Sequence, residues 1–296
     1  MEELKNCPAC KGTQYTFLRK CKDFTVSKEQ FSLVECSTCK LVFTNPRPDA
    51  SHIGKYYESS EYISHSNSKK GIVNQLYQIV RSYSLKNKLK LINNLGTTNK
   101  QILDIGCGTG EFLSVCKENG WKTIGIEPND KARNQAKENW GLSVFPESHL
   151  DLLKSNERPS VITMWHVLEH VHSLDERLIQ ISALLASSGY LIVAVPNKES
   201  WDAKYYSDLW AAFDVPRHLY HFSPSVIKTL VGKYGFEHIT SMAMKFDSFY
   251  VSMLSEKHKT GKQNLLKALF IGLWSNIKAL GNPEKYSSVI YIFKKN

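Results

Sequence analysis

The chain has 296 residues, enough for one large hydrophobic core or for a core with a small appended module. Lysine and arginine outnumber aspartate and glutamate by 38 to 28, and the excess lies in residues 51–100 and 251–296. There is no long low-complexity tract, signal peptide or membrane-spanning apolar run, so a cytoplasmic globular protein is expected. The basic flanks suit an anionic partner such as a phosphorylated substrate, a membrane surface or RNA, or they serve solubility alone.

Two Cys-x-x-Cys turns stand within residues 1–48, separated by a hairpin-like stretch of apolar and polar residues. Each turn can direct two thiolates at one tetrahedral ion, and such an ion folds a segment too short to build its own core. The sequence therefore predicts a small zinc-ribbon module with the ligands Cys7, Cys10, Cys36 and Cys39. Cys21 is expected to be a free thiol.

Residues 49–98 are predicted to form a helical linker that caps the following domain, because apolar residues recur there at helical spacing and end at Gly96. The apolar run 101–105 then leads into Gly106, Gly108 and Gly110, and Glu127 follows the next apolar run. Such glycines let the backbone approach a ligand, and the carboxylate can accept hydrogen bonds from ribose hydroxyls. The alternative is an ordinary strand-to-helix turn with a solvated acid.

The spacing Asp-x-Gly-x-Gly-x-Gly resembles that of class I S-adenosylmethionine-dependent methyltransferases. The resemblance implies an α/β domain over 99–296 with a Rossmann-like seven-stranded sheet, in which strands alternate with helices and the last strand, 287–293, runs antiparallel. It also implies a cofactor site. The residues expected there are Asp104, Gly106, Cys107, Gly108 and Gly110 in the loop, Glu127 and Pro128 for the ribose, Glu147 and Ser148 for the adenine, and Trp165 beside the sulfonium. A core-packing role is the alternative for Trp165.

The segment 41–48, between the cysteine module and this core, is similar to the corresponding segment of bacterial zinc-ribbon methyltransferases, which modify sugars, surface polysaccharides and other small metabolites.

Two clusters of titratable residues lie in the predicted methyltransferase domain. In the first, His166, Glu169 and His170 would share one face if the segment is helical. This arrangement resembles the Glu-x-x-Glu-His of ubiquinone-pathway O-methyltransferases, which hold a divalent cation there, although His166 replaces a glutamate. The match implies a second cation site with His218, and a capping and packing role for Glu169 and His170 is the alternative.

The second cluster lies in a long aromatic-rich connection, 197–224, predicted to be a lid over the substrate. His218 is the candidate general base, with His221 as the alternate and His166 as a further catalytic candidate. Structural hydrogen bonding is the competing interpretation. Arg217 is expected either to hold a substrate phosphate or carboxylate, or to pair with Asp214.

Residues 249–283 form an insertion that contains a basic amphipathic segment. It is expected either to contact a membrane surface or partner, or to dock its apolar face on the protein's own core.

The favoured function is methylation of a small molecule or cell-envelope glycan precursor, at oxygen, with a histidine base. The alternative is a ribosomal RNA base methyltransferase, disfavoured because the core is not basic and Met164-Trp165-His166-Val167 replaces an Asn/Asp-Pro-Pro-Tyr motif. A non-catalytic cofactor-binding protein is a third hypothesis.

Overall fold

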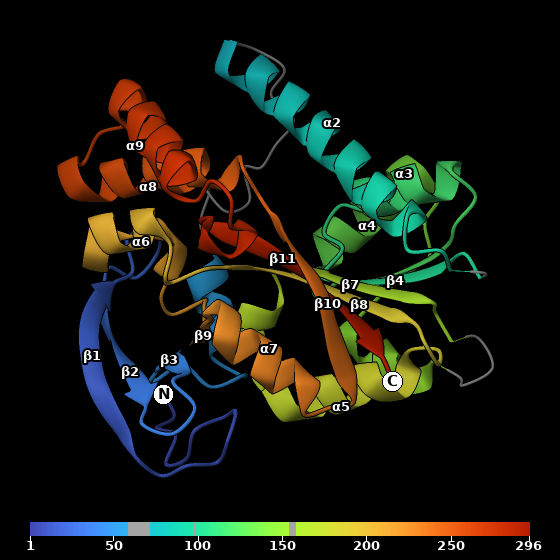
Figure 1. Ribbon diagram of the computed structural model, residues 1–296, viewed down its shortest axis with the longest axis horizontal. Coiled ribbons are helices and arrows are strands. Elements are labelled where there is room, and N and C mark those ends of the chain that lie inside the picture. Colours follow the sequence, from blue (N-terminus) through green and yellow to red (C-terminus); the bar gives the residue numbers. More distant parts are fainter. Residues whose placement is uncertain (59–71, 98, 154–157) are drawn as a thin grey trace.

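A seven-stranded sheet in the order β10-β11-β8-β7-β4-β5-β6 forms the centre of the molecule (Figure 1). The computed structural model describes residues 1–58, 72–97, 99–153 and 158–296. The strands are β4 (Gln101–Ile105), β5 (Lys122–Ile126), β6 (Val144–Phe145), β7 (Val161–Trp165), β8 (Tyr190–Pro196), β10 (Phe236–Ala243) and β11 (Ser288–Lys295). The five strands from β6 to β8 are parallel, and β11 is antiparallel to both neighbours. This confirms the predicted Rossmann-like sheet and its antiparallel last strand.

Helices cover both faces of this sheet (Figure 1). On one face lie α2 (Ile72–Asn93), α3 (Glu111–Glu118) and α4 (Asp130–Trp140), and on the other lie α5 (Leu174–Leu184) and α7 (Pro224–Gly232). Alternate residues of β8 point to the two cores, since Leu191 and Val193 belong to one buried cluster and Ile192 to the other. The part of the predicted cap at 59–71 and 98 lies outside the described residues.

The N-terminal residues form a second, four-stranded antiparallel sheet in the order β1-β2-β3-β9. Its strands are β1 (Tyr15–Lys22), β2 (Gln30–Cys36), β3 (Val42–Thr44) and β9 (Tyr220–His221). Strand β9 comes from the segment predicted to be a lid, and it pairs Tyr220 with Phe43 and His221 with Val42. Because Cys36 and Phe43 also share a buried cluster with the large sheet, the N-terminal module packs directly against the domain.

Short helices shape the rest of the lid and the other turns. They are η1 (Ile53–Tyr57), η2 (Glu147–Leu152), η4 (Leu168–His170), α6 (Trp201–Tyr206), η5 (Ser207–Leu209), η6 (Ala211–Phe213) and η7 (Pro283–Lys285). The buried carboxylate of Asp202 accepts hydrogen bonds from Trp210 Nε1 (2.8 Å), Ser275 Oγ (2.7 Å) and Ser287 Oγ (2.6 Å). The lid is thus fixed to the C-terminal part of the chain.

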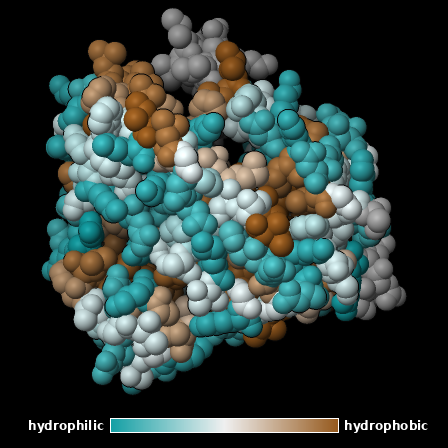
Figure 2. All heavy atoms as spheres, viewed as in Figure 1, coloured by the Kyte–Doolittle hydropathy of each residue, from teal (hydrophilic) through white to brown (hydrophobic). Residues whose placement is uncertain are grey.

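The insertion after β10 folds into two helices, α8 (Asp247–Thr260) and α9 (Leu265–Lys278), which pack on α6 and the lid. Helix α9 turns its small residues inward: Ala268 and Ser275 are buried, and a side chain at Gly272 would bring Cβ within 2.9 Å of Phe249 Cα. Its large apolar residues point outward, with Leu266 83% and Phe270 63% exposed, and Figure 2 shows the resulting hydrophobic patch. Among the described residues, no helix is both long and apolar enough to span a bilayer.

Candidate functional site

The glycine loop after β4 has the backbone conformation that requires glycine. Gly106, Gly108 and Gly110 all have positive φ angles, of 75°, 57° and 82°. A Cβ at Gly106 would lie 2.3 Å from Val167 Cγ2, and one at Gly110 would lie 2.9 Å from Ala136 Cβ. The described structure has no heavy atom within 4 Å of the equivalent point at Gly108. Packing therefore requires Gly106 and Gly110, whereas Gly108 borders open space in which a ligand can approach the backbone.

Glu127 lies at the carboxyl end of β5, directly against this loop. Its Oε2 accepts from Gly108 N (2.9 Å) and its Oε1 from Asn129 N (2.9 Å). Burial raises the pKa of Glu127, although these two N–H donors oppose the shift. Cys107 is buried against Gly125, and Pro128 is exposed with its carbonyl accepting from Arg133 Nη1 (2.7 Å). The structure thus brings Glu127 and the glycine loop together, and their role in ribose recognition stays a prediction.

Three further side chains border the loop. Asp104 is buried beside Thr163, whose Oγ1 donates to Oδ1 (2.5 Å), and burial raises the pKa of Asp104 to about 7. Lys88 of α2 places Nζ 4.1 Å from the ring centroid of Trp165. Burial lowers the pKa of Lys88, while the charges of Asp104 and Asp247 oppose that shift. Lys88 could not be singled out from the sequence. The periodicity of α2 predicts its apolar face, but it does not predict which of its lysines lies beside Trp165.

Glu147 and Ser148, the adenine candidates, begin η2 after β6 and are both exposed. Glu147 forms an ion pair with Arg177 of α5. Burial is the largest cause of the raised pKa of Glu127, and the negative charge of Glu147 adds to it. Their place beside Glu127 fits the expected cofactor orientation, and their role in adenine recognition stays a prediction.

His166 follows β7 in a left-handed conformation, with φ of 55°. The helix expected over 166–170 is therefore only the short turn η4, which begins two residues later. His166 Nε2 lies 3.2 Å from Asp247 Oδ2, and Nδ1 lies 3.5 Å from Glu169 Oε1. Burial would lower the pKa of His166, but these two carboxylates raise it to about 10. His166 is thus a cation between two acids.

Glu169, His170 and His218 form a compact buried group, with ligand atoms that all lie within 4.8 Å of one another. The two imidazole centroids are 4.6 Å apart. Neither carboxylate oxygen of Glu169 has a hydrogen-bond partner among the described residues. Burial and the charge of His218 lower the pKa of His170 to about 4. Leu219 N donates to Glu169 O (2.7 Å), so β9 and η4 hold the group together.

His221 lies apart from this group. Its ring is buried between Thr44, with Nε2 3.3 Å from Oγ1, and Phe213, and burial lowers the pKa of His221 well below its usual value. Arg217 is 1% exposed and pairs with Asp214, with Nη2 to Oδ1 at 2.6 Å. Of the two roles predicted for Arg217, the structure confirms the pairing with Asp214.

The four predicted zinc ligands converge at one end of the N-terminal sheet. Their sulfur atoms lie within 4.8 Å of one another, with Cys7 to Cys39 and Cys10 to Cys36 both at 3.5 Å. Burial opposes ionisation of Cys36, but backbone N–H groups of Cys39 and Thr38 lower its pKa to about 7. Cys21 is buried as a free thiol in a separate cluster.

Comparison with known proteins agrees with this geometry. Similar curated proteins include the ubiquinone biosynthesis O-methyltransferases of Pelagibacter ubique strain HTCC1062 and Rickettsia canadensis strain McKiel. The first is 27% identical over 124 residues, which are 40% of this chain and 50% of that protein. The second is 26% identical over 152 residues, which are 49% and 64%. The chain thus spans about half to two thirds of the length of these relatives.

Among solved structures, magnesium protoporphyrin IX methyltransferase from Synechocystis PCC 6803 with bound SAH has the same fold. Its TM-score is 0.55 at 12% identity, over 84% of this chain and 100% of that one. A family model described as a methyltransferase domain matches residues 77–241, which is more than half of the chain. The chain therefore belongs to this methyltransferase-domain family and has the class I, S-adenosylmethionine-dependent architecture predicted from its glycine loop.

Proposed function

We propose that this protein transfers the methyl group of S-adenosylmethionine to a hydroxyl oxygen of a small molecule, with His218 as the general base. The observation that carries the proposal is the buried group of Glu169, His170 and His218 beside the glycine loop, where Val167 packs directly on Gly106. The names of the curated relatives, which are O-methyltransferases, support transfer to oxygen.

Methyl transfer is an in-line displacement in which a neutral thioether leaves, so the protein aligns the acceptor and removes its proton. His218 Nδ1 donates to Ala212 O (2.8 Å), which leaves Nε2 as the lone-pair nitrogen of the neutral ring. His166 is a poorer base, because Asp247 and Glu169 keep it protonated, and His221 is committed to Thr44. We therefore assign proton removal to His218 and a supporting electrostatic role to His166.

The alternative for this group is a second divalent cation, which would occupy the Nε2 lone pair of His218, so that His218 would be a ligand and not the base. The carboxylate of Glu169 has no hydrogen-bond partner among the described residues, although it forms an ion pair with His166. With the two imidazole nitrogens it forms a donor set that favours a transition metal over Mg²⁺. His166, which sequence comparison included in this set, would remain outside it and hold Glu169. A cation bound there would supply Lewis acidity that lowers the pKa of an acceptor hydroxyl.

A structural zinc ion at Cys7, Cys10, Cys36 and Cys39 is also part of the proposal. Tetrahedral coordination with bonds of about 2.3 Å places sulfur atoms about 3.8 Å apart. The sulfur separations of 3.5 Å described above are close to that value.

The outward apolar stripe of α9 leads us to propose that the acceptor is a lipid-linked or envelope glycan precursor, reached at an anionic membrane surface. The stripe consists of Leu265, Leu266, Leu269, Phe270, Leu273, Trp274, Ile277 and Leu280. Exposed lysines flank it, including Lys259, Lys262 and Lys278, whereas the acids Asp247 and Glu256 face inward. A dimer through the stripe would bring these lysines together, but an anionic bilayer attracts them.

Co-sedimentation with vesicles tests this contact. We expect binding to phosphatidylglycerol vesicles and little to phosphatidylcholine vesicles, and at least about a tenfold loss of affinity when Leu266 and Phe270 become serine, because about 3 kcal/mol of apolar burial is lost. Ile179→Ser on α5, which removes an exposed apolar residue (58%) outside the α8–α9 insertion, should leave binding unchanged. Failure of the wild-type protein to bind, or concentration-dependent dimerisation that the serine variant abolishes, contradicts the membrane contact.

Transfer of labelled methyl from S-adenosylmethionine into fractionated lysate tests the function itself. We expect label in the lipid-linked glycan or small polar pool, because the carboxyl edge of the sheet presents the candidate base and the excess of basic residues lies in 51–100 and 251–296. Nuclease-sensitive label would instead support the RNA methyltransferase alternative.

A further inference from the structure

The buried guanidinium of Arg217 joins the N-terminal module to the lid. Arg217 donates from Nε and Nη2 to Asp214 (3.0 and 2.6 Å), from Nη2 to Asp23 Oδ1 (3.2 Å) and from Nη1 to Tyr56 O (2.8 Å). Four of the five N–H donors of Arg217 thus bind two carboxylates and a carbonyl, and 1% of the residue is exposed, so Arg217 is not available to a substrate. Arg217 must therefore act through the groups that it binds, which are Asp23, Asp214 and the carbonyl of Tyr56.

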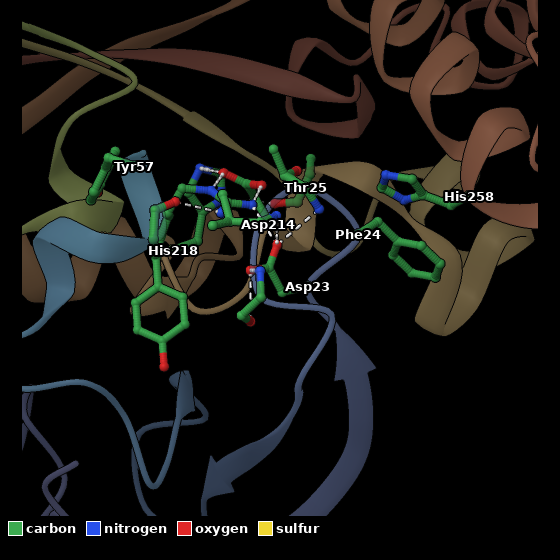
Figure 3. A network of polar contacts seen from close by, with 12 residues as sticks. Asp23, Phe24, Thr25, Tyr57, Asp214, His218 and His258 are labelled. Atoms are coloured by element: carbon green, nitrogen blue, oxygen red, sulfur yellow. Dashed lines mark hydrogen bonds and ion pairs between the residues drawn. The ribbon is translucent and has the colours of Figure 1, made fainter. Parts of the chain in front are cut away.

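Asp23 is oriented by its own turn. Oδ1 accepts from Thr25 N (2.9 Å) and Val26 N (3.1 Å), and Oδ2 accepts from Ser27 N (2.8 Å). Burial would raise the pKa of Asp23, but these N–H donors and Arg217 lower it, so the carboxylate stays ionised. Figure 3 shows this turn beneath Asp214, with Phe24 stacked on His258 of α8 at a centroid distance of 4.1 Å. The N-terminal module thus places the oriented carboxylate of Asp23 against Arg217.

The backbone around Arg217 fixes both imidazoles of the candidate site. The carbonyl oxygen of Arg217 accepts from His170 Nδ1 (2.9 Å), and Tyr57 OH lies 3.0 Å from the same nitrogen. His218 donates its backbone N–H to Asp214 O (3.0 Å) and Nδ1 to Ala212 O. Because a carbonyl oxygen only accepts, both rings carry their proton on Nδ1 and present Nε2 as the lone-pair nitrogen.

The N-terminal sheet holds the other side of the same segment. Thr44 Oγ1 donates to His218 O (2.9 Å), and Thr44 N donates to Leu219 O (3.0 Å). We propose that Arg217, held between Asp23 and Asp214, is a positioning residue that fixes the tautomer and orientation of His170 and His218. The N-terminal module is thereby a working part of the catalytic centre. The expected effect on turnover rests on the proposed function, whereas the effect on the rings does not.

Long-range ¹H–¹⁵N correlation spectra of histidine-labelled, zinc-containing protein at neutral pH test the inference. In the wild type we expect the Nδ1–H tautomer for both rings, with signals assigned through His170→Gln and His218→Gln. Asp23→Asn and Arg217→Lys should each give mixed tautomers and lower methyl transfer at least about tenfold, with S-adenosylhomocysteine affinity unchanged. Arg47→Lys is the matched control, since Arg47 is also buried and links Glu2 to Tyr220 OH and His172 O.

A pure Nδ1–H tautomer in both variants, or equal mixing in Arg47→Lys, would overturn the inference. Should Arg217→Lys fail to bind S-adenosylhomocysteine, Asp23→Asn decides the question, because it removes the charge that faces Arg217 and leaves Arg217 itself in place. The two proposals can fail separately. If the wild-type protein shows no methyl transfer but the variants show mixed tautomers, the positioning role is supported and the proposed function is contradicted.

Discussion

Replacing His218 with glutamine is expected to lower methyl transfer by about 100- to 10,000-fold, which is the usual contribution of a general base. Glutamine keeps a polar side chain in the buried position but cannot accept a proton from the acceptor. S-adenosylhomocysteine affinity should not change, because the proposed cofactor site, the glycine loop with Glu127, does not include His218. The rate is measured on the lysate fraction that accepts the labelled methyl group.

His221→Gln is the control for this experiment, since its ring lies in the same segment but binds Thr44. We expect its effect on rate to be small and its effect on melting temperature to resemble that of His218→Gln. Full turnover in His218→Gln with normal cofactor binding would exclude His218 as the base. A selective loss in His221→Gln would transfer the role to the alternate residue.

Gly108→Ala is expected to weaken S-adenosylhomocysteine binding at least about tenfold while the fold survives, a loss of about 1.4 kcal/mol. The new methyl group meets no protein atom within 4 Å, so it enters the space left for the ligand. The positive φ of 57° adds about 1 to 2 kcal/mol of backbone strain. Titration calorimetry measures the affinity, and thermal unfolding measures the cost to the fold.

Gly110→Ala separates packing from binding. Its Cβ would lie 2.6 Å from Leu142 Cδ1, so we expect overpacking of about 1 to 3 kcal/mol in addition to strain, and a melting temperature roughly 5–10 °C lower. If Gly108→Ala bound S-adenosylhomocysteine as tightly as the wild type, the open space above the loop would not be the cofactor site.

The seven-stranded sheet was predictable because local signals agree along the chain. Apolar runs such as 101–105 and 191–195 match β4 and β8 within one residue, and glycines mark adjoining turns, Gly106 after β4 and Gly189 before β8. Four cysteines at paired spacing likewise predicted a cluster that the structure brings together. These features depend on residues close in sequence, or on a doubled cysteine spacing that is typical of metal sites.

The parts that sequence reasoning missed depend on long-range contacts. The two residues of β9 carry no strand pattern of their own, and they become a strand only because β3 offers them an edge. Lys88 is an ordinary basic residue until the fold places it beside Trp165. The pairing of Arg217 with Asp214 was predicted, but its contact with Asp23, 194 residues away in sequence, was not. The tight turn at His166 replaced the expected helical face, so this ring meets Asp247 rather than His218.

The pairing of β9 with β3 has a consequence for any exchange of parts between related enzymes. A chimera that takes residues 1–48 from a homologue would set a foreign edge against Tyr220 and His221, and a foreign side chain against Arg217. Strand β9 and the Arg217 loop must therefore be transplanted together with the cysteine module. Segments 1–48 and 214–221 thus form one structural unit, although residues 49–213 lie between them along the chain.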